Sequence, residues 1–133
     1  MKEFNEIKGD LSRLNAWVDN TFAPESIQHS AGLGDMNYEQ TKQMYTDLIT
    51  AFNPVGTMKH MVAEDDLVVW HFNWSGTHQG TFMGVPPTGK KVDIGVNLIT
   101  KMNGGKCNEI WSYQDNLGLM RQLGAIPGPS PVK

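Results

Sequence analysis

The stretch LVVWHFNW, from Leu67 to Trp74, decides the fold because aromatic and polar side chains alternate along its second half. On a β-strand, successive side chains point to opposite faces of the sheet. Trp70, Phe72 and Trp74 are therefore expected to share one face of a strand. Three large rings on one face predict that this face forms a buried interface or the wall of a pocket.

Downstream of this strand the chain continues in the same way. Residues 92–102 are expected to form a long strand, and Asn103-Gly104-Gly105 is a good hairpin turn. Residues 107–113 are expected to form the returning strand. A short closing helix is then predicted, ending at Gly124, because glycine commonly terminates helices.

Upstream of the strand the apolar period is helical. Residues 4–18 carry apolar side chains at helical spacing, and Gly9-Asp10 is expected to divide them into two short helices. A further helix is expected to begin near Asn37, a good N-cap, and to stop before Pro54. Residues 25–36 show no clear period and are predicted to be irregular. Helices followed by antiparallel strands predict an α+β fold with the sheet packed on the helices.

Length and composition narrow the class of protein. A chain of 133 residues predicts one domain over residues 1–125, followed by a flexible Pro/Gly-rich tail over 126–133. A net charge of −3 without a basic cluster argues against a nucleic-acid partner. No apolar run is long enough for a membrane span or a signal peptide. A single cysteine, Cys107, cannot form an internal disulfide, so a cytoplasmic protein is expected.

The segment GVPPTGKK, residues 84–91, has the spacing of a phosphate-binding loop up to its last position. Such a loop cradles phosphates with backbone N–H groups, and Pro86 and Pro87 have none. The position of the Mg²⁺-binding Ser or Thr is Lys91, and the residues after it alternate like a strand. We therefore expect an exposed connection between two strands and no nucleotide site.

The histidines and the cysteine show no pattern typical of a metal or nucleophile site. None of the pairs among the four histidines, His29, His60, His71 and His78, has zinc-ligand spacing, so no metal is expected. His78 lies in the glycine-flanked segment SGTHQGTF, where backbone can approach a ligand or simply bend a strand. From spacing alone, each histidine is expected to be structural or at the surface.

One carboxylate has two interpretations. On an unbroken strand, Asp115 shares a face with Trp111 and Tyr113, and a carboxyl among aromatic rings is suited to proton transfer because desolvation raises its pKa. Alternatively, Asp115 precedes Asn116-Leu117-Gly118 and caps the last helix. Spacing favours the cap, and the two roles do not exclude each other.

Two longer stretches, DDLVVWHFNWSGTHQGTFMGVPPTGKKV and GGKCNEIWSYQDNLGLMRQLG, resemble the SnoaL-like polyketide cyclase family, typified by nogalonic acid methyl ester cyclase. The shared pattern includes Gly-Thr-His-x-Gly-x-Phe-x-Gly, Pro-Pro-Thr-Gly-Lys and Gly-Lys-x-x-Glu-x-Trp. The resemblance covers roughly residues 20–124.

This resemblance implies a cone of the nuclear-transport-factor-2-like (NTF2-like) superfamily, with a curved sheet around an apolar pocket. It implies homodimers or homotetramers paired through sheets, and a cofactor-free intramolecular aldol closure of a small apolar substrate. By the family's motif, Asp115 is the acid/base residue. His29 and His78 match histidines common in the pattern, and the resemblance implies that they are catalytic residues as well. The implied substrate-binding residues are Trp111, Tyr113, Asn53, Trp70, Phe72 and Phe22.

The local order Asn-Pro-Val-Gly around Asn53 departs from the family's usual Pro-Asp-Leu, and Ile110 stands where a histidine is frequent. The superfamily also includes proteins without chemistry, so fold alone decides little. A non-catalytic ligand-binding or assembly module therefore stays an alternative. The catalytic interpretation requires Asp115 inside an enclosed cavity, whereas the binding interpretation predicts that it caps the last helix.

Overall fold

The computed structural model describes residues 1–127 and shows four helices and six strands within that range. The helices are α1 (Lys2–Asn5), α2 (Leu11–Thr21), α3 (Tyr38–Phe52) and α4 (Asn116–Gln122). The strands are β1 (Phe22–Ser30), β2 (Gly34–Met36), β3 (Val55–Glu64), β4 (Leu67–Thr77), β5 (Lys91–Asn103) and β6 (Lys106–Gln114). Of the predicted tail, residues 128–133 lie outside the described residues.

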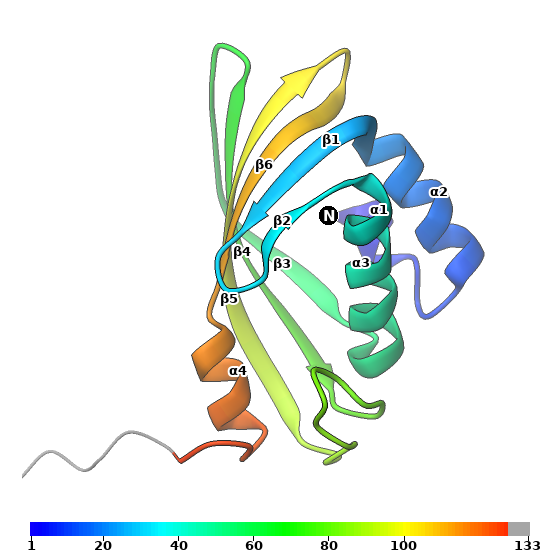
Figure 1. The fold of residues 1–133 in the computed structure, drawn as a ribbon, viewed down its shortest axis with the longest axis vertical. Coiled ribbons are helices and arrows are strands. Elements are labelled where there is room, and N and C mark those ends of the chain that lie inside the picture. Colours follow the sequence, from blue (N-terminus) through cyan, green and yellow to red (C-terminus); the bar gives the residue numbers. More distant parts are fainter. Residues whose placement is uncertain (128–133) are drawn as a thin grey trace, which may run out of the picture.

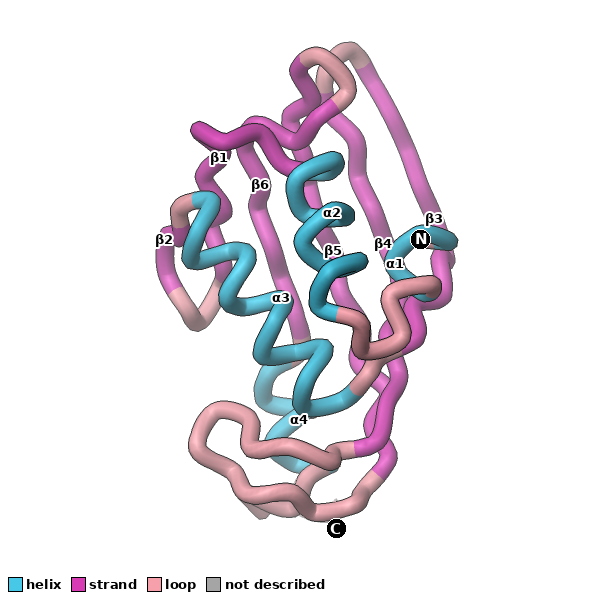
Figure 2. Tube along the Cα trace, turned by 90° about the vertical axis from the view of Figure 1, so that its right-hand side faces the viewer, coloured by secondary structure: helices cyan, strands magenta, loops and turns pink. Residues whose placement is uncertain are grey.

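The strands form one sheet in the order β2-β1-β6-β5-β4-β3. All neighbours are antiparallel except β1 and β6, which run parallel. The sheet curves without closing, and α1, α2 and α3 lie on its concave side (Figure 1). Turned by 90°, α2 and α3 are seen to run along the sheet, and α4 lies at its lower end (Figure 2). The expected α+β cone with a curved sheet is confirmed.

The helices begin where the sequence predicts. Asp10 caps α2 by accepting hydrogen bonds from the N–H groups of Ser12 and Arg13, so the expected division at Gly9-Asp10 is confirmed. Asn37 and Gln40 form a capping box at the start of α3, which satisfies two N–H groups that the helix itself leaves free. At its other end α3 stops at Asn53, whose φ of 45° is left-handed.

Strand β1 corrects the prediction that residues 25–36 are irregular. Its polar side chains Ser26 and Gln28 face the interior and are buried, whereas the apolar Ile27 is exposed. The hydrophobic alternation is thus inverted with respect to an ordinary half-buried strand. The backbone pairing with β6, not the apolar pattern, therefore determines this strand.

A β-bulge in β6 corrects a second expectation. Met102 pairs with Cys107 while Lys101 pairs with Glu109, so Asn108 is an extra residue in the strand. A bulge of this kind reverses the facing of the side chains on its two sides. Cys107 therefore lies in the interior, and Glu109 and the residues of the same parity after it lie on the convex face.

The core consists of two clusters at opposite ends of the concave face. One gathers α1 and α2 against the start of β1 and the middle of β6; its members are Phe4, Ile7, Leu14, Val18, Phe22, Ile49, Cys107 and Ile110. The other gathers the end of α3 and α4 on β4 and β5; its members are Leu48, Ala51, Phe52, Trp74, Val92, Ile94, Val96, Leu119 and Leu123. Tyr45 and Leu98 pack against both clusters.

A glycine brings the end of α3 onto the sheet. A Cβ atom on Gly76 of β4 would lie 2.6 Å from the carbonyl oxygen of Phe52, so no side chain fits there. This contact lets the second cluster form tightly at the lower end of the cone. None of the described helices is long and apolar enough to cross a membrane.

Candidate functional site

A cavity of about 290 Å³ lies between the concave face and the helices. Trp70, Phe72 and Trp74 of β4 line it, as the alternation in LVVWHFNW predicts, and Phe22 lines it from the start of β1. Much of the remaining wall is apolar and comes from the N-terminal segment with α1 and α2, from α3, from β5 and from the connection after β4. Such a cavity is of the size and character that binds small organic molecules.

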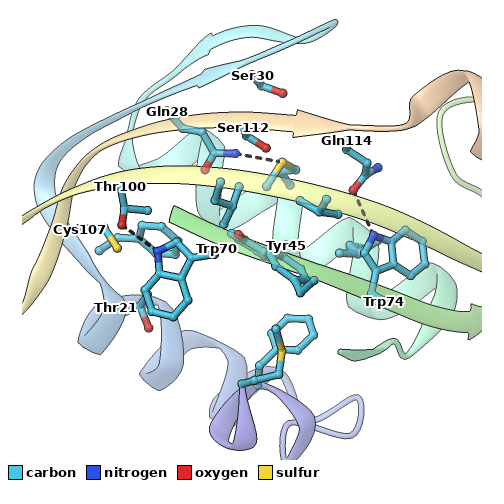
Figure 3. Close-up of a pocket in the computed structure, with 18 of the residues that line it drawn as sticks. Thr21, Gln28, Ser30, Tyr45, Trp70, Trp74, Thr100, Cys107, Ser112 and Gln114 are labelled. Atoms are coloured by element: carbon cyan, nitrogen blue, oxygen red, sulfur yellow. Dashed lines mark hydrogen bonds between the residues drawn. The ribbon is translucent and has the colours of Figure 1, made fainter. Parts of the chain in front are cut away.

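The polar side chains of the pocket come mainly from the sheet. Figure 3 shows Gln28, Ser30, Ser112 and Gln114 on β1 and β6, with Tyr45 of α3 among the rings. Ser112 and Gln114 face inward because they pair with the inward Leu98 and Val96. The wall thus combines flat apolar surfaces with a line of uncharged hydrogen-bonding groups.

The two indoles of the pocket are held in place by hydrogen bonds. Trp70 donates its Nε1–H to Thr100 Oγ1 at 2.8 Å, and Trp74 donates to Gln114 Oε1 at 3.1 Å (Figure 3). A buried indole N–H needs such a partner. With their N–H groups satisfied, the rings present apolar surface to the cavity.

Burial keeps two ionisable groups of the wall, the Tyr45 phenol and the Cys107 thiol, uncharged. Desolvation raises the pKa of the Tyr45 phenol, and nearby Cys107 raises it further. Desolvation also raises the pKa of the Cys107 thiol, although a hydrogen bond with Thr100 opposes this. Tyr45 is therefore a neutral hydrogen-bond donor at physiological pH, not a base.

Asp115 lies outside this cavity. Its side chain is exposed and accepts a hydrogen bond from the N–H of Gly118 at 2.8 Å, which makes it the N-cap of α4. Its neighbours Gln114 and Asn116 do line the pocket. The structure therefore places Asp115 as the capping interpretation predicts, and corrects the expectation of an enclosed carboxyl.

Trp111 and Tyr113 also lie away from the pocket. They pair with Ile99 and Asn97, which face the convex side of the sheet. After the bulge at Asn108 the pairing of β6 is regular, so the even-numbered Ser112 and Gln114 face the interior and Trp111 and Tyr113 face away from it. The pocket is lined instead by Ser112 and Gln114, which occupy the alternate positions of the same strand.

His29 lies on the convex face as well. Its Nδ1 is 2.8 Å from Asp35 Oδ1, and its Nε2 is 2.7 Å from Glu109 Oε2. The hydrogen bond with Glu109, then that with Asp35, raises the pKa of His29 above 6.5. Its ring stacks on Trp111 at 5.6 Å. Both nitrogens are thus engaged, and the side chain connects β1, β2 and β6 instead of facing a ligand.

His78 is fully buried but does not line the cavity. Its Nδ1 accepts a hydrogen bond from the N–H of Thr88 at 3.2 Å, and its backbone pairs with Lys90 and Gly89. The ring stacks on Phe52, which in turn packs on the pocket residue Phe82. His78 therefore anchors the Pro-Pro connection, which the sequence predicts as a link between two strands. It also contacts the pocket residue Phe82 indirectly, through Phe52.

Asn53 completes the predicted set and likewise does not line this cavity. It is exposed, adopts the left-handed conformation, and ends α3 with its N–H bonded to the carbonyl of Ile49. Asparagine is favoured there because it tolerates positive φ. In the part of the chain that the structure describes, no group of three or more His, Cys, Asp or Glu could hold a metal ion.

Sequence reasoning missed the most informative polar residues of the pocket, Gln28, Tyr45 and Ser112. Tyr45 lies at helical spacing with Leu48 and Phe52, and such a pattern does not distinguish a phenol that lines a pocket from an ordinary core ring. Gln28 lies in the segment predicted to be irregular. One signal could have located Gln28: the resemblance places residues 20–36 within the family's domain, so a strand there was to be expected.

A model of the family described as SnoaL-like polyketide cyclase matches residues 4–123 of the chain. No curated protein matches this chain. The solved structure of wild-type IdmH from Streptomyces antibioticus, a candidate polyketide cyclase, is 27% identical; the alignment covers 92% of this chain and 91% of IdmH, with a TM-score of 0.74.

Two further structures share the architecture. TsrD from Streptomyces laurentii is 25% identical over 95% of this chain and 92% of its own, with a TM-score of 0.76. AclR from Streptomyces galilaeus, a candidate hydroxylase, is 24% identical over 92% of this chain and 95% of its own, with a TM-score of 0.75. At this identity the likeness to AclR supports a shared fold only. These likenesses confirm the expected NTF2-like fold.

Proposed function

Because the chain belongs to the SnoaL-like polyketide cyclase family, we propose that it binds an apolar, oxygenated small molecule in the pocket and closes a ring in it. The observation that carries the proposal is the cavity itself, of about 290 Å³, walled by aromatic rings with uncharged polar groups between them. The reaction is an intramolecular aldol addition without a cofactor.

The aldol step makes defined demands on the protein. An activated C–H loses its proton, the resulting carbanion attacks a carbonyl carbon, and the carbonyl oxygen takes up a proton, so no atom is lost. The developing oxyanion needs a hydrogen-bond donor. The neutral Tyr45 hydroxyl is suited to this role because its raised pKa keeps the proton in place. A base must also reach the C–H group, and by family resemblance this is Asp115.

One observation favours the alternative, a ligand-binding module without chemistry. Among the described residues that line the cavity, the only carboxylate is Glu3, which is exposed, and no histidine is present. For Asp115 to act as a base, its carboxylate has to leave the cap of α4 and turn toward the pocket. The binding step is common to both functions, so an experiment has to separate binding from turnover.

The experiment uses nogalonic acid methyl ester, the substrate that typifies the family, and follows ring closure by absorbance and binding by calorimetry. Ser112→Trp fills the cavity from β6 and is expected to weaken binding at least tenfold and to abolish turnover. The control Tyr113→Trp, on the opposite face of the same strand, is expected to leave both unchanged. Binding without turnover would identify the binding module, and no effect of Ser112→Trp would contradict the pocket as the site.

The convex face of the sheet is the proposed contact between two copies of the chain. An apolar row crosses four strands there, because Trp111 pairs with Ile99, Ile99 with Val69, and Val69 with Val62. Val62 and Val69 are exposed, at 63% and 40%. An exposed apolar row of this extent supports a homodimer paired through its sheets.

A further inference from the structure

Gln28 is the one pocket side chain with a fully buried polar atom that has no partner among the described residues. The residue is only 2% exposed, and its Oε1 accepts no hydrogen bond. Its Nε2 lies 3.9 Å from the sulfur of Met44, a weak acceptor (Figure 3). Buried polar groups are nearly always hydrogen-bonded, so an exception in a cavity wall calls for a cause.

The orientation of this amide follows from its neighbour. With Nε2 toward Met44, an N–H group faces the sulfur, which can accept weakly. The opposite orientation would direct the carbonyl oxygen at the sulfur lone pairs and gain nothing. Oε1 is therefore the end of the amide that is left without a partner in the cavity wall, and the group that it lacks is a donor.

The polar side chains that share the cavity wall do not supply that donor. The N–H groups of Trp70 and Trp74 already donate to Thr100 and Gln114. The hydroxyl groups of Ser30, Tyr45 and Ser112 make no hydrogen bond with Gln28 Oε1. An unpaired buried carbonyl destabilises the folded protein, and a bound molecule with a hydroxyl or N–H group removes this cost.

The charge of the wall limits which molecule this is. Among the described lining residues there is no lysine, arginine or histidine side chain. Tyr45 and Cys107 are uncharged because burial raises their pKa values. An anionic ligand would meet no cationic side chain in the described wall and would lie near the carboxylate of Glu3, which is unfavourable. The cavity is therefore suited to neutral molecules.

We propose that Gln28 determines the specificity of the pocket by accepting a hydrogen bond from a neutral donor, a hydroxyl or an N–H group, on an apolar ligand. This inference rests on the proposed function, because it takes the pocket as the ligand site. It adds which residue recognises the ligand and which chemical group of the ligand is recognised.

The test compares 2-naphthol with 2-methylnaphthalene, which has nearly the same shape but no donor, and with the anion 2-naphthoate. Dissociation constants are measured for wild-type protein and for Gln28→Leu, with Met58→Leu as an apolar change in the same cavity wall that keeps both Gln28 and Met44. The ratio of the dissociation constants of 2-naphthol and 2-methylnaphthalene is expected to shift by about five- to tenfold toward 2-methylnaphthalene in Gln28→Leu, as one hydrogen bond predicts. Met58→Leu is expected to leave the ratio unchanged, and 2-naphthoate is expected to bind weakest.

A second measurement separates recognition from a structural role. Because the unpaired carbonyl is removed, Gln28→Leu is expected to raise the Tm of the free protein by a few degrees; Gln28→Met serves if leucine does not fit. An unchanged ratio of dissociation constants in a variant that binds both probes would overturn this inference alone. Failure of the wild-type protein to bind either probe would count against the proposed function as well.

Discussion

A single histidine on the convex face connects three strands. His29 of β1 reaches Asp35 of β2 and Glu109 of β6, at 2.8 Å and 2.7 Å. The imidazolium is more strongly bound by these carboxylates than neutral imidazole, which is why its pKa rises above 6.5. Sequence reasoning assigned the residue to catalysis because a histidine at this place is common in the family, but spacing does not show which face of a strand it occupies.

This arrangement predicts a pH dependence of stability. A folded-state pKa above the unfolded value means that the contribution of His29 is fully present below about pH 6.5 and is lost as the pH rises through the folded value. The urea midpoint of the wild-type protein is therefore expected to exceed that of His29→Gln most at about pH 5.5, and the difference should shrink toward pH 9.

The carboxylates provide the control for this measurement. Glu109→Gln leaves His29 in place but removes its strongest partner, so the pH dependence is expected to weaken. A difference between the wild-type protein and His29→Gln that stays constant from pH 5.5 to 9 would show that the ring acts by packing on Trp111 and not by its charge.

At the scale of elements, α4 depends on the carboxylate that precedes it. Asp115 accepts the N–H of Gly118 and starts a helix whose Leu119 is fully buried in the lower core cluster. Asp115→Ala is expected to lower the free energy of unfolding by about 1 kcal/mol, whereas Asp115→Asn, an equally good cap, should change it by less than about 0.5 kcal/mol. Urea denaturation measures both.

The same two variants also test whether Asp115 is the acid/base residue. Asp115→Asn retains the cap and removes the base, so a role in proton transfer predicts that kcat falls by about a hundredfold or more while ligand binding is kept. An unchanged rate would exclude Asp115 from the mechanism. A loss of activity in Asp115→Ala alone would instead result from the loss of α4 at the end of the cone.

Much of the element order could be predicted from sequence because caps and periods are local. Asp10, Asn37 and the Asn103-Gly104-Gly105 turn act within a few residues, and the structure confirms them. The facing of β6 could not be predicted, since one inserted residue, Asn108, reverses it. Strand β1 could not be predicted from its apolar pattern, because its inward-facing side chains Ser26 and Gln28 are polar. The errors thus concentrate on the strands that build the pocket.

At the scale of the whole molecule, the convex face is the large apolar surface that the fold leaves uncovered. The four residues of the row, Val62, Val69, Ile99 and Trp111, lie side by side on β3, β4, β5 and β6. Helices cover only the concave face (Figure 1). A second sheet of the same shape would cover the row, which is the physical basis of the proposed homodimer.

A charge introduced in the middle of the row tests the proposed homodimer. Val69→Lys is expected to convert the dimer into a monomer in analytical ultracentrifugation, because an ammonium group would be buried without a partner. The far-ultraviolet circular dichroism should not change, since Val69 faces away from the core. Leu11→Lys, at an apolar position on α2 that is 48% exposed, is the matched control and should leave the mass unchanged. A wild-type protein that sediments as a monomer would contradict the pairing, while the pocket on the other side of the sheet would stay unaffected as a binding site.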